Sequence, residues 1–166
     1  MSLRSDGTTY GLGTRAIHWG IALLILCLIA SGYLSDDFKT ITPTHKAVGI
    51  FVLALGLIRL LWWLLDGPRP GDETMGPEKY LARLVKWALA AVGIIMPLSG
   101  WLMSSAADKP LAHLFKESHE TIAIALVVLL GLHVAGALRH HFLIQDNVLT
   151  RMLPCAARCG VGRKEV

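Results

Sequence analysis

Long apolar blocks alternate with short polar segments along the chain, and this pattern predicts its main elements. Four blocks, each close to the roughly 20 residues that a helix needs to cross a bilayer, cover about Ala16–Leu34, Thr44–Leu65, Tyr80–Met103 and Ser118–His141. The connections between them are short, so consecutive helices are expected to be antiparallel neighbours. The sequence therefore predicts an all-α fold, a four-helix transmembrane bundle.

Polar and helix-breaking residues set the limits of these blocks. The segment D-G-P-R-P-G-D, residues 66–72, ends the second block, and Pro97 is expected to kink the third. The first block is long for the apolar region of a signal peptide and lacks a small-x-small cleavage pattern. It is therefore interpreted as the first span.

Composition agrees with a membrane protein. The chain has 166 residues, of which 54% are hydrophobic and 17% charged, and a mean hydropathy of +0.54, which is unusual for a soluble domain. We expect an N-terminal tail (1–14), one transmembrane domain (15–143) and a C-terminal tail (144–166). The net charge of +4 does not indicate nucleic-acid binding, because the basic residues cluster at the ends of the apolar blocks.

The positions of lysine and arginine predict the orientation. Of the 16 basic residues, only Lys39, Lys46, Lys109 and Lys116 fall on the side of the first and third connections. The others fall on the side of the two termini. Because cytoplasmic loops are enriched in lysine and arginine, both termini are expected to be cytoplasmic.

Four histidines carry the candidate chemistry. His119 and His133 are 14 residues apart in the fourth block, so they project from nearly the same helix face and lie about 21 Å apart along it. His45, near the start of the second block, matches the depth of His119. His18, near the start of the first, matches that of His133. Each depth thus receives one imidazole from each of two helices.

Two imidazoles at each of two depths are what two stacked b-type haems need as axial ligands. A single interfacial histidine is more often an ordinary surface residue, but His133 lies deep in an apolar run, where ionisable residues are usually functional. A zinc or copper site is an alternative, although it would gather three or four ligands at one depth. No C-x-x-C-H motif is present, which excludes covalent haem attachment by that motif.

Residues near the histidines fit the same hypothesis. Gly49 and Gly136 would leave room for a flat macrocycle, or would simply allow close helix packing. Arg59, at the depth of the His18–His133 pair, could bind a haem propionate or extend to the membrane boundary. Of the three cysteines, Cys27 is interpreted as a small core residue of the first span. The role of Cys155 and Cys159 in the tail stays open.

Several segments together resemble the prokaryotic cytochrome b561 family. They are R-A-I-H-W-G around His18, T-H-K-A-V-G-I around His45, S-H-E-T-I-A around His119, and G-L-H-V-A-G-A-L-R-H-H-F with D-N-V-L-T-R-M-L-P. The resemblance covers about Arg15–Pro154. It implies a bacterial inner-membrane protein with two haem b groups that exchanges electrons with quinone.

The resemblance also implies a quinone-binding role for His140, which could instead belong to a basic interfacial pair with His141. Phe142 and Gln145 depart from the family pattern beside it. The expected function is electron transfer to ubiquinone, preferably as a superoxide:ubiquinone oxidoreductase. Four lysines could steer the anion on the external face, although acidic residues share that face: Asp36, Asp37, Asp108, Glu117 and Glu120.

The alternative function is that of a haem-carrying membrane anchor, an electron-transfer subunit serving a separate redox enzyme. The expected partners are membrane lipid, quinone and superoxide, with no nucleic acid. Homo-oligomerisation is left open, and no further catalytic residue is predicted.

Overall fold

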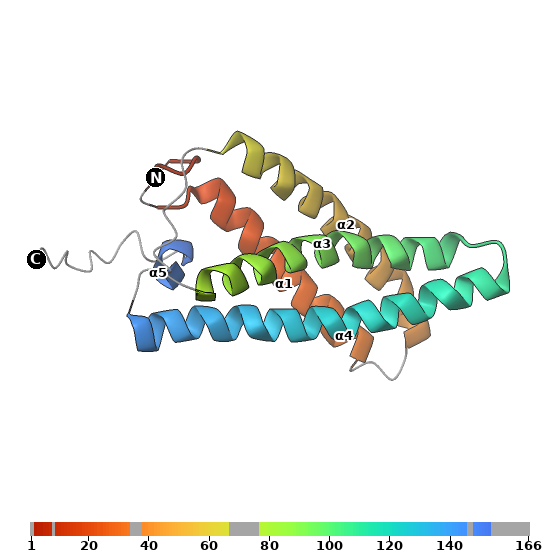
Figure 1. Ribbon diagram of the computed structural model, residues 1–166. Helices are drawn as coiled ribbons and strands as arrows, with labels where there is room; N and C mark the ends of the chain where they lie inside the picture. The colour runs from red at the N-terminus through yellow and green to blue at the C-terminus, as the bar shows by residue number, and fades with distance from the viewer. Residues whose placement is uncertain (1, 8, 34–37, 67–76, 146–147, 154–166) are drawn as a thin grey trace, which may run out of the picture.

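Helices form nearly all of the structure, as the apolar pattern predicts. The computed structural model describes residues 2–7, 9–33, 38–66, 77–145 and 148–153. Its elements are α1 (Leu12–Tyr33), α2 (Phe38–Leu65), α3 (Pro77–Ser105), α4 (Lys109–Arg139), a π-helical turn η1 (His140–Ile144) and α5 (Val148–Met152). The fold is an all-α bundle, with α1 to α4 as its four long helices (Figure 1).

The exterior of the bundle is apolar. Four of the described helices are long and apolar enough to cross a membrane, and at most 6% of the residues in each spanning segment are buried. Large side chains such as Leu23, Leu64 and Leu84 are 60%, 66% and 65% exposed. Apolar surface of this extent is incompatible with a soluble monomer and fits contact with lipid.

Packing follows chain order. Close contacts join α1 with α2, α2 with α3 and, most extensively, α3 with α4. Helix α4 approaches the backbones of α1 and α2 closely at few points. Side chains that bridge α4 to α1 or α2 therefore meet across a wider separation than side chains between sequential helices.

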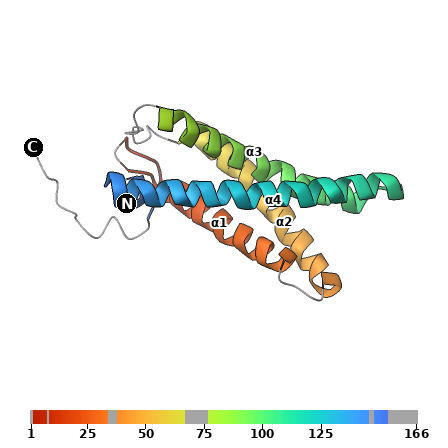
Figure 2. The same ribbon diagram turned by 60° about the horizontal axis from the view of Figure 1, so that its bottom comes forward.

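The bundle has two ends, which we name by what lies there. The terminal face carries the start of α1, the end of α4, and α5 (Figure 1). The hairpin face carries the end of α1 and the connection from α3 to α4. That connection projects beyond the end of α1 (Figure 2).

Helix α4 begins nine residues before the predicted start of the fourth span. Asp108 has extended backbone angles (φ −98°, ψ 135°), and Pro110 stands in the first turn. Proline is favoured there because its missing N–H would have no helical acceptor and its φ is already helical. The apolar block marked the membrane-spanning part, whereas these capping residues set the start of the helix about 14 Å further out.

The N-terminal segment is tied to the terminal face. The carboxylate of Asp66, at the end of α2, accepts hydrogen bonds from the Ser5 backbone N–H (2.8 Å), the Ser5 hydroxyl (2.6 Å) and the Thr14 hydroxyl (2.7 Å). Ser5 is 5% exposed. Part of the segment expected as a tail is therefore packed against the bundle.

The described part of the C-terminal segment also contacts the bundle. The indole N–H of Trp19 donates to the carbonyl of Met152 (2.9 Å), and the guanidinium of Arg15 donates to that of Leu153 (3.3 Å). These bonds hold the end of α5 against α1. Cys27 of α1 is exposed, so its interpretation as a core residue is wrong. Cys155 and Cys159 lie outside the described residues.

Candidate functional site

One histidine pair lies toward the terminal face. His18 projects from α1 and His133 from α4, and their ring centres are 6.3 Å apart with an angle of 66° between the planes. Both side chains are partly buried. This terminal-face pair brings together residues 115 positions apart in the chain, across two helices whose backbones rarely approach each other.

A second pair lies toward the hairpin face. His45 projects from α2 and His119 from α4, with ring centres 6.4 Å apart and an interplanar angle of 72°. The geometry of this hairpin-face pair is nearly the same as that of the first. Helix α4 therefore contributes one imidazole to each pair, and the partner imidazoles come from α1 and α2.

The ring separation in both pairs fits one metal ion between two imidazoles. A separation of this size leaves room for a metal ion between the two rings, since bonds from a metal to histidine nitrogen are about 2.0–2.1 Å long. Direct packing of two rings would place them at about 4.5–7 Å with no preference for this value. Within the described residues, no group of three or more His, Cys, Asp or Glu side chains is placed to hold a metal. The zinc or copper alternative would need such a group of three or four ligands.

In the hairpin-face pair, hydrogen bonds set the orientation of His45. Its Nδ1 lies 2.8 Å from the Ser31 hydroxyl, which itself donates to the carbonyl of Leu28 (2.9 Å). Because the hydroxyl proton is already used, the ring N–H at Nδ1 is the donor. In that tautomer Nε2 carries the lone pair, which is the form that binds a metal.

His119 is held by the same kind of arrangement. Its Nδ1 lies 3.1 Å from the carbonyl of Met96 and 3.0 Å from the Ser99 hydroxyl, which donates to that same carbonyl (2.7 Å). A carbonyl can only accept, so Nδ1 carries the proton. Ser99 is 6% exposed, and its side chain helps to fix the ring.

Glycines allow α3 and α1 to approach these rings. A Cβ added at Gly100 would lie 3.1 Å from Cε1 of His119, closer than ordinary contact, and one at Gly32 would lie 3.8 Å from Cε1 of His45. Gly49 and Gly136, noted in the sequence, have no such neighbour within 4 Å. Their faces are open enough for a flat group.

The terminal-face pair has a charged neighbour instead. Nη1 of Arg59 lies 2.8 Å from Nδ1 of His18. A guanidinium has only donors, so here Nδ1 of His18 is the acceptor. Arg59 is partly buried beside the pair, the depth expected from its position 14 residues after His45. Its guanidinium contacts a candidate metal ligand. An arginine that only extended to the membrane boundary to reach water would not need this contact.

His140 belongs to neither of the two ring pairs. It opens η1, close enough to Glu78 of α3 for their charges to interact. Arg139, directly before it, donates two hydrogen bonds to the Glu78 carboxylate (2.6 and 2.9 Å). Gln145 ends η1 in the left-handed conformation (φ 59°). The terminal ends of α3 and α4 are thus joined beside His140.

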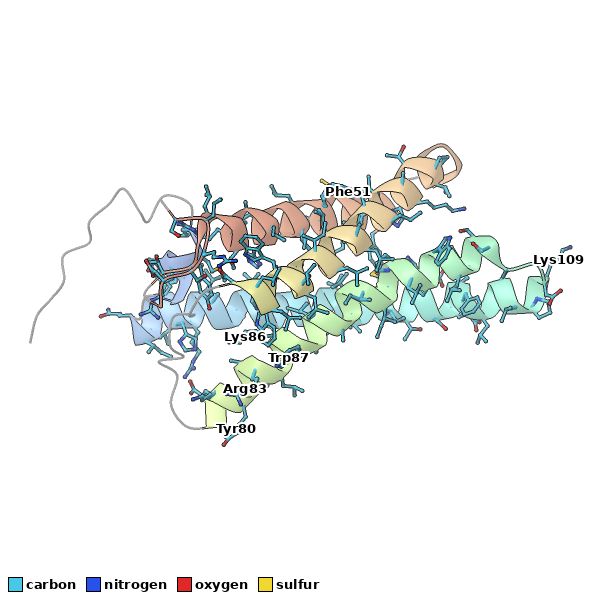
Figure 3. All side chains as sticks on the ribbon, turned by 90° about the horizontal axis from the view of Figure 1, so that it is seen from above. Phe51, Tyr80, Arg83, Lys86, Trp87 and Lys109 are labelled. Carbon is cyan, nitrogen blue, oxygen red and sulfur yellow. The ribbon has the colours of Figure 1, made fainter. Side chains whose placement is uncertain are left out.

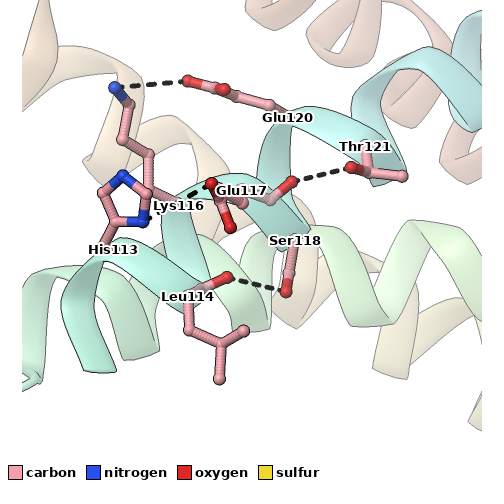
Figure 4. Close-up of polar contacts among 7 residues, drawn as sticks. All are labelled: His113, Leu114, Lys116, Glu117, Ser118, Glu120 and Thr121. Carbon is pink, nitrogen blue, oxygen red and sulfur yellow. Dashed lines mark hydrogen bonds and ion pairs between the residues drawn. The ribbon is translucent and has the colours of Figure 1, made fainter. Parts of the chain in front are cut away.

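Charges at the hairpin face are paired locally. On the first turns of α4, Nζ of Lys116 lies 3.6 Å from Glu120, and Nδ1 of His113 lies 3.5 Å from Glu117 (Figure 4). All four side chains are more than 60% exposed. Exposed pairs of this kind are weak, but they reduce the positive field that lysines alone would produce. This matches the mixture of charges read from the sequence.

The sequence predicted the four histidines and Arg59 as site residues but gave no sign of Ser31, Ser99 and Gly100, which the structure places against the imidazoles. A serine in an apolar span is a weak signal, because a hydroxyl can bond the carbonyl three or four residues earlier in its own helix. Both serines do so. Only the packing of helices shows that they also face an imidazole.

The fold and these pairs define a class: an α-helical membrane protein with paired interior histidines suited to hold haem. Comparison with known proteins is consistent with it. The sequence profile of the family described as prokaryotic cytochrome b561 matches residues 9–155. The chain belongs to this family, whose members are membrane haem proteins of electron transfer.

Curated relatives match along most of their length. The chain is 28% identical over 181 aligned positions to "Cytochrome b561 homolog 2" of Escherichia coli (strain K12), covering 92% of the chain and 95% of the relative. It is 27% identical over 165 positions to "Probable superoxide oxidase CybB" of Yersinia pestis, covering 83% and 92%. No solved structure matches the chain.

Proposed function

We propose that the protein holds two haem b groups and conducts electrons across the membrane to the quinone pool. The observation that carries this proposal is the separation of 6.3 and 6.4 Å between ring centres in two histidine pairs. His18 and His133 would hold one haem, and His45 and His119 the other. The absence of a C-x-x-C-H motif supports non-covalent binding.

The chain's residues would prepare each site for one-electron chemistry, which the haem iron supplies when bound. Ser31, Ser99 and the carbonyl of Met96 hold the hairpin-face imidazoles by their Nδ1 atoms. Such outer partners fix the ring orientation and raise the basicity of the ligand.

We assign the terminal face to the cytoplasm, because 12 of the 16 basic residues fall on that side. The two pairs then form a path between the two sides of a bacterial inner membrane. His140, on the terminal face, would donate a hydrogen bond to a quinone carbonyl and provide a proton. Ubiquinone is the proposed acceptor.

The proposed electron donor is superoxide, which makes the activity that of a superoxide:ubiquinone oxidoreductase. The name of the Yersinia pestis relative supports this, as do Lys39, Lys46, Lys109 and Lys116 on the external side. Each superoxide would lose one electron to become dioxygen. Two such electrons and two protons would convert the quinone to quinol.

A second candidate function has its own observation. The hairpin between α3 and α4 projects beyond the end of α1 (Figure 2) and exposes Leu111 (42%) and Leu114 (56%). That surface could dock a separate redox enzyme, for which the chain would be the haem-carrying anchor. Reduction by superoxide without a partner protein distinguishes the two candidates.

Haem stoichiometry tests the core of the proposal. A pyridine haemochrome assay on purified protein should find two haems per chain, and acid-acetone should extract both. Stopped-flow mixing with superoxide should then reduce them faster than spontaneous dismutation removes the superoxide, and added ubiquinone should reoxidise them. One haem per chain would refute the two-site reading. Reduction no faster than dismutation would favour the anchor.

A further inference from the structure

One arginine of the terminal face is buried. Among the residues that the structure describes, Arg15 of α1 is the only charged one in this class, with 7% of its surface exposed. Its Nη1 donates a hydrogen bond to the Leu153 carbonyl (3.3 Å), and no described atom accepts from its buried Nε. The ion pairs of the described part join other residues. Among described groups, the guanidinium thus has one distant, neutral acceptor for a full charge.

Such a position is costly as it stands. An arginine side chain keeps its proton in proteins, so Arg15 cannot become neutral to avoid the burial of its charge. Buried charges are normally paired and hydrogen-bonded, and a buried donor without an acceptor loses the bonds that it made to water. An anionic acceptor that reaches Arg15 would remove both costs.

The place of Arg15 on α1 indicates where that acceptor comes from. At 100° per residue, Arg15 projects between His18 and Trp19, about 60° from the first and 40° from the second. It lies one turn before His18, a spacing that makes side chains neighbours on a helix surface. On the Trp19 side, the bonds from Arg15 and Trp19 to backbone carbonyls at the end of α5 hold that helix against α1. Arg15 therefore lies between the terminal-face pair and α5.

We propose that Arg15 binds a carboxylate of the haem held by His18 and His133. This rests on the proposed two-haem function. Haem b carries two carboxylate groups on one edge of its ring, and a guanidinium binds a carboxylate through two parallel N–H···O bonds. The Nε that lacks a described partner, together with a terminal nitrogen of Arg15, provides such a pair of donors.

A lipid phosphate offers the same oxyanion chemistry from a different source. A headgroup reaches a side chain from the membrane surface, whereas Arg15 is almost wholly covered by protein. A haem carboxylate arrives with the group that His18 binds one turn away. The burial of Arg15 therefore favours the haem, and the two sources give different results in the experiments below.

Haem retention measures the contribution of Arg15. Purified holoprotein is mixed with excess apomyoglobin, and the loss of each haem is followed by Soret absorbance. The component absent from His18→Ala identifies the terminal-face haem. Arg15→Gln should release that haem about tenfold faster, the effect of one charge-assisted hydrogen bond, and should leave the other unchanged. Arg15→Lys keeps the charge but lacks the planar fork of donors, so its rate should fall between those of the wild type and Arg15→Gln.

Resonance Raman spectra report on the carboxylate itself. The bending bands of haem propionates fall in frequency when a hydrogen bond to the carboxylate is lost. His45→Ala, which is expected to keep only the terminal-face haem, provides a background with one haem. Adding Arg15→Gln to it should lower one propionate band, and adding Arg15→Lys should lower it less. If Arg15→Gln does not fold, Arg15→Lys carries both measurements.

Two variants are matched controls. Trp19→Phe removes the other hydrogen bond that holds the end of α5 and keeps the guanidinium, so it separates loosening of α5 from loss of the carboxylate partner. Arg83→Gln removes an exposed charge at the terminal-face end of α3 (Figure 3). Both should release the terminal-face haem at close to the wild-type rate and leave its propionate bands unmoved.

Three results would overturn the inference. The first is unchanged haem release and propionate bands in the Arg15 variants, and the second is an equal effect in Trp19→Phe. The third is unmoved bands together with loss of co-purified phospholipid phosphorus in Arg15→Gln, which would assign the site to lipid. A wild type that holds fewer than two haems would instead refute the proposed function. Two haems in the wild type with any of the three results would refute only the role of Arg15.

Discussion

Gly100 gives the sharpest test of how α3 shapes the hairpin-face pair. In Gly100→Ala the new Cβ would lie 3.1 Å from Cε1 and 3.3 Å from Nδ1 of His119. Ordinary contact begins at 3.4 Å, so the ring would have to move by about 0.3 Å. The ring cannot yield freely, because Met96 and Ser99 hold its Nδ1.

Two opposing effects set the magnitude. Alanine in a helix is favoured over glycine by about 1 kcal/mol, whereas overpacking costs about 1–3 kcal/mol. The gain in helix stability applies to the whole fold, whereas the strain from overpacking acts on the ring of His119. We therefore expect a thermal midpoint close to that of the wild type and hairpin-face haem binding weakened by about 1–2 kcal/mol, or about 5- to 30-fold.

The assay is haem retention during dilution into apomyoglobin, combined with the low-spin ferric EPR signals of the two sites. Only the signal lost in His45→Ala should move, since it reports on the pair that includes His119. Gly56→Ala is the control, because its Cβ would meet Ile94 at an ordinary 3.9 Å. An unchanged hairpin-face signal in Gly100→Ala, or an equal change in Gly56→Ala, would refute the argument.

Three further predictions concern other parts of the molecule. His18→Ala and His45→Ala should each lose a different haem and retain one per chain by pyridine haemochrome, and loss of the same spectral component in both would contradict the pairing. Asp66→Ala should lower the free energy of unfolding by about 1–3 kcal/mol, because it leaves Ser5 without its acceptor. The measurement is a thermal melt followed by Soret absorbance. Asp108→Ala is the control and should have a much smaller effect, because the Asp108 side chain makes no capping bond. His140→Ala should slow reoxidation by ubiquinone in stopped flow without slowing haem reduction, and normal reoxidation would remove His140 from the quinone site.

The hydrophobic pattern by itself predicted the fold class, because crossing a bilayer demands about 20 apolar residues in a helix that satisfies its own hydrogen bonds. The spacing of His119 and His133 on one helix also follows from sequence, since helical periodicity is local. Their partners at matching depths could be proposed because the helices are antiparallel and membrane-spanning. The start of α4 was misplaced, because its polar first turns lie outside the apolar block.

Tertiary structure decided what surrounds each ring. The contacts of Ser31 with His45, Ser99 with His119 and Arg59 with His18 join residues 14, 20 and 41 positions apart in the chain. Each depends on the rotation and crossing of two helices, which no single helical periodicity specifies. For the same reason, Gly100 is distinguishable from other glycines of the spans only once α3 is packed against His119. Local periodicity fixes which face a residue occupies, and only interhelical packing fixes what that face meets.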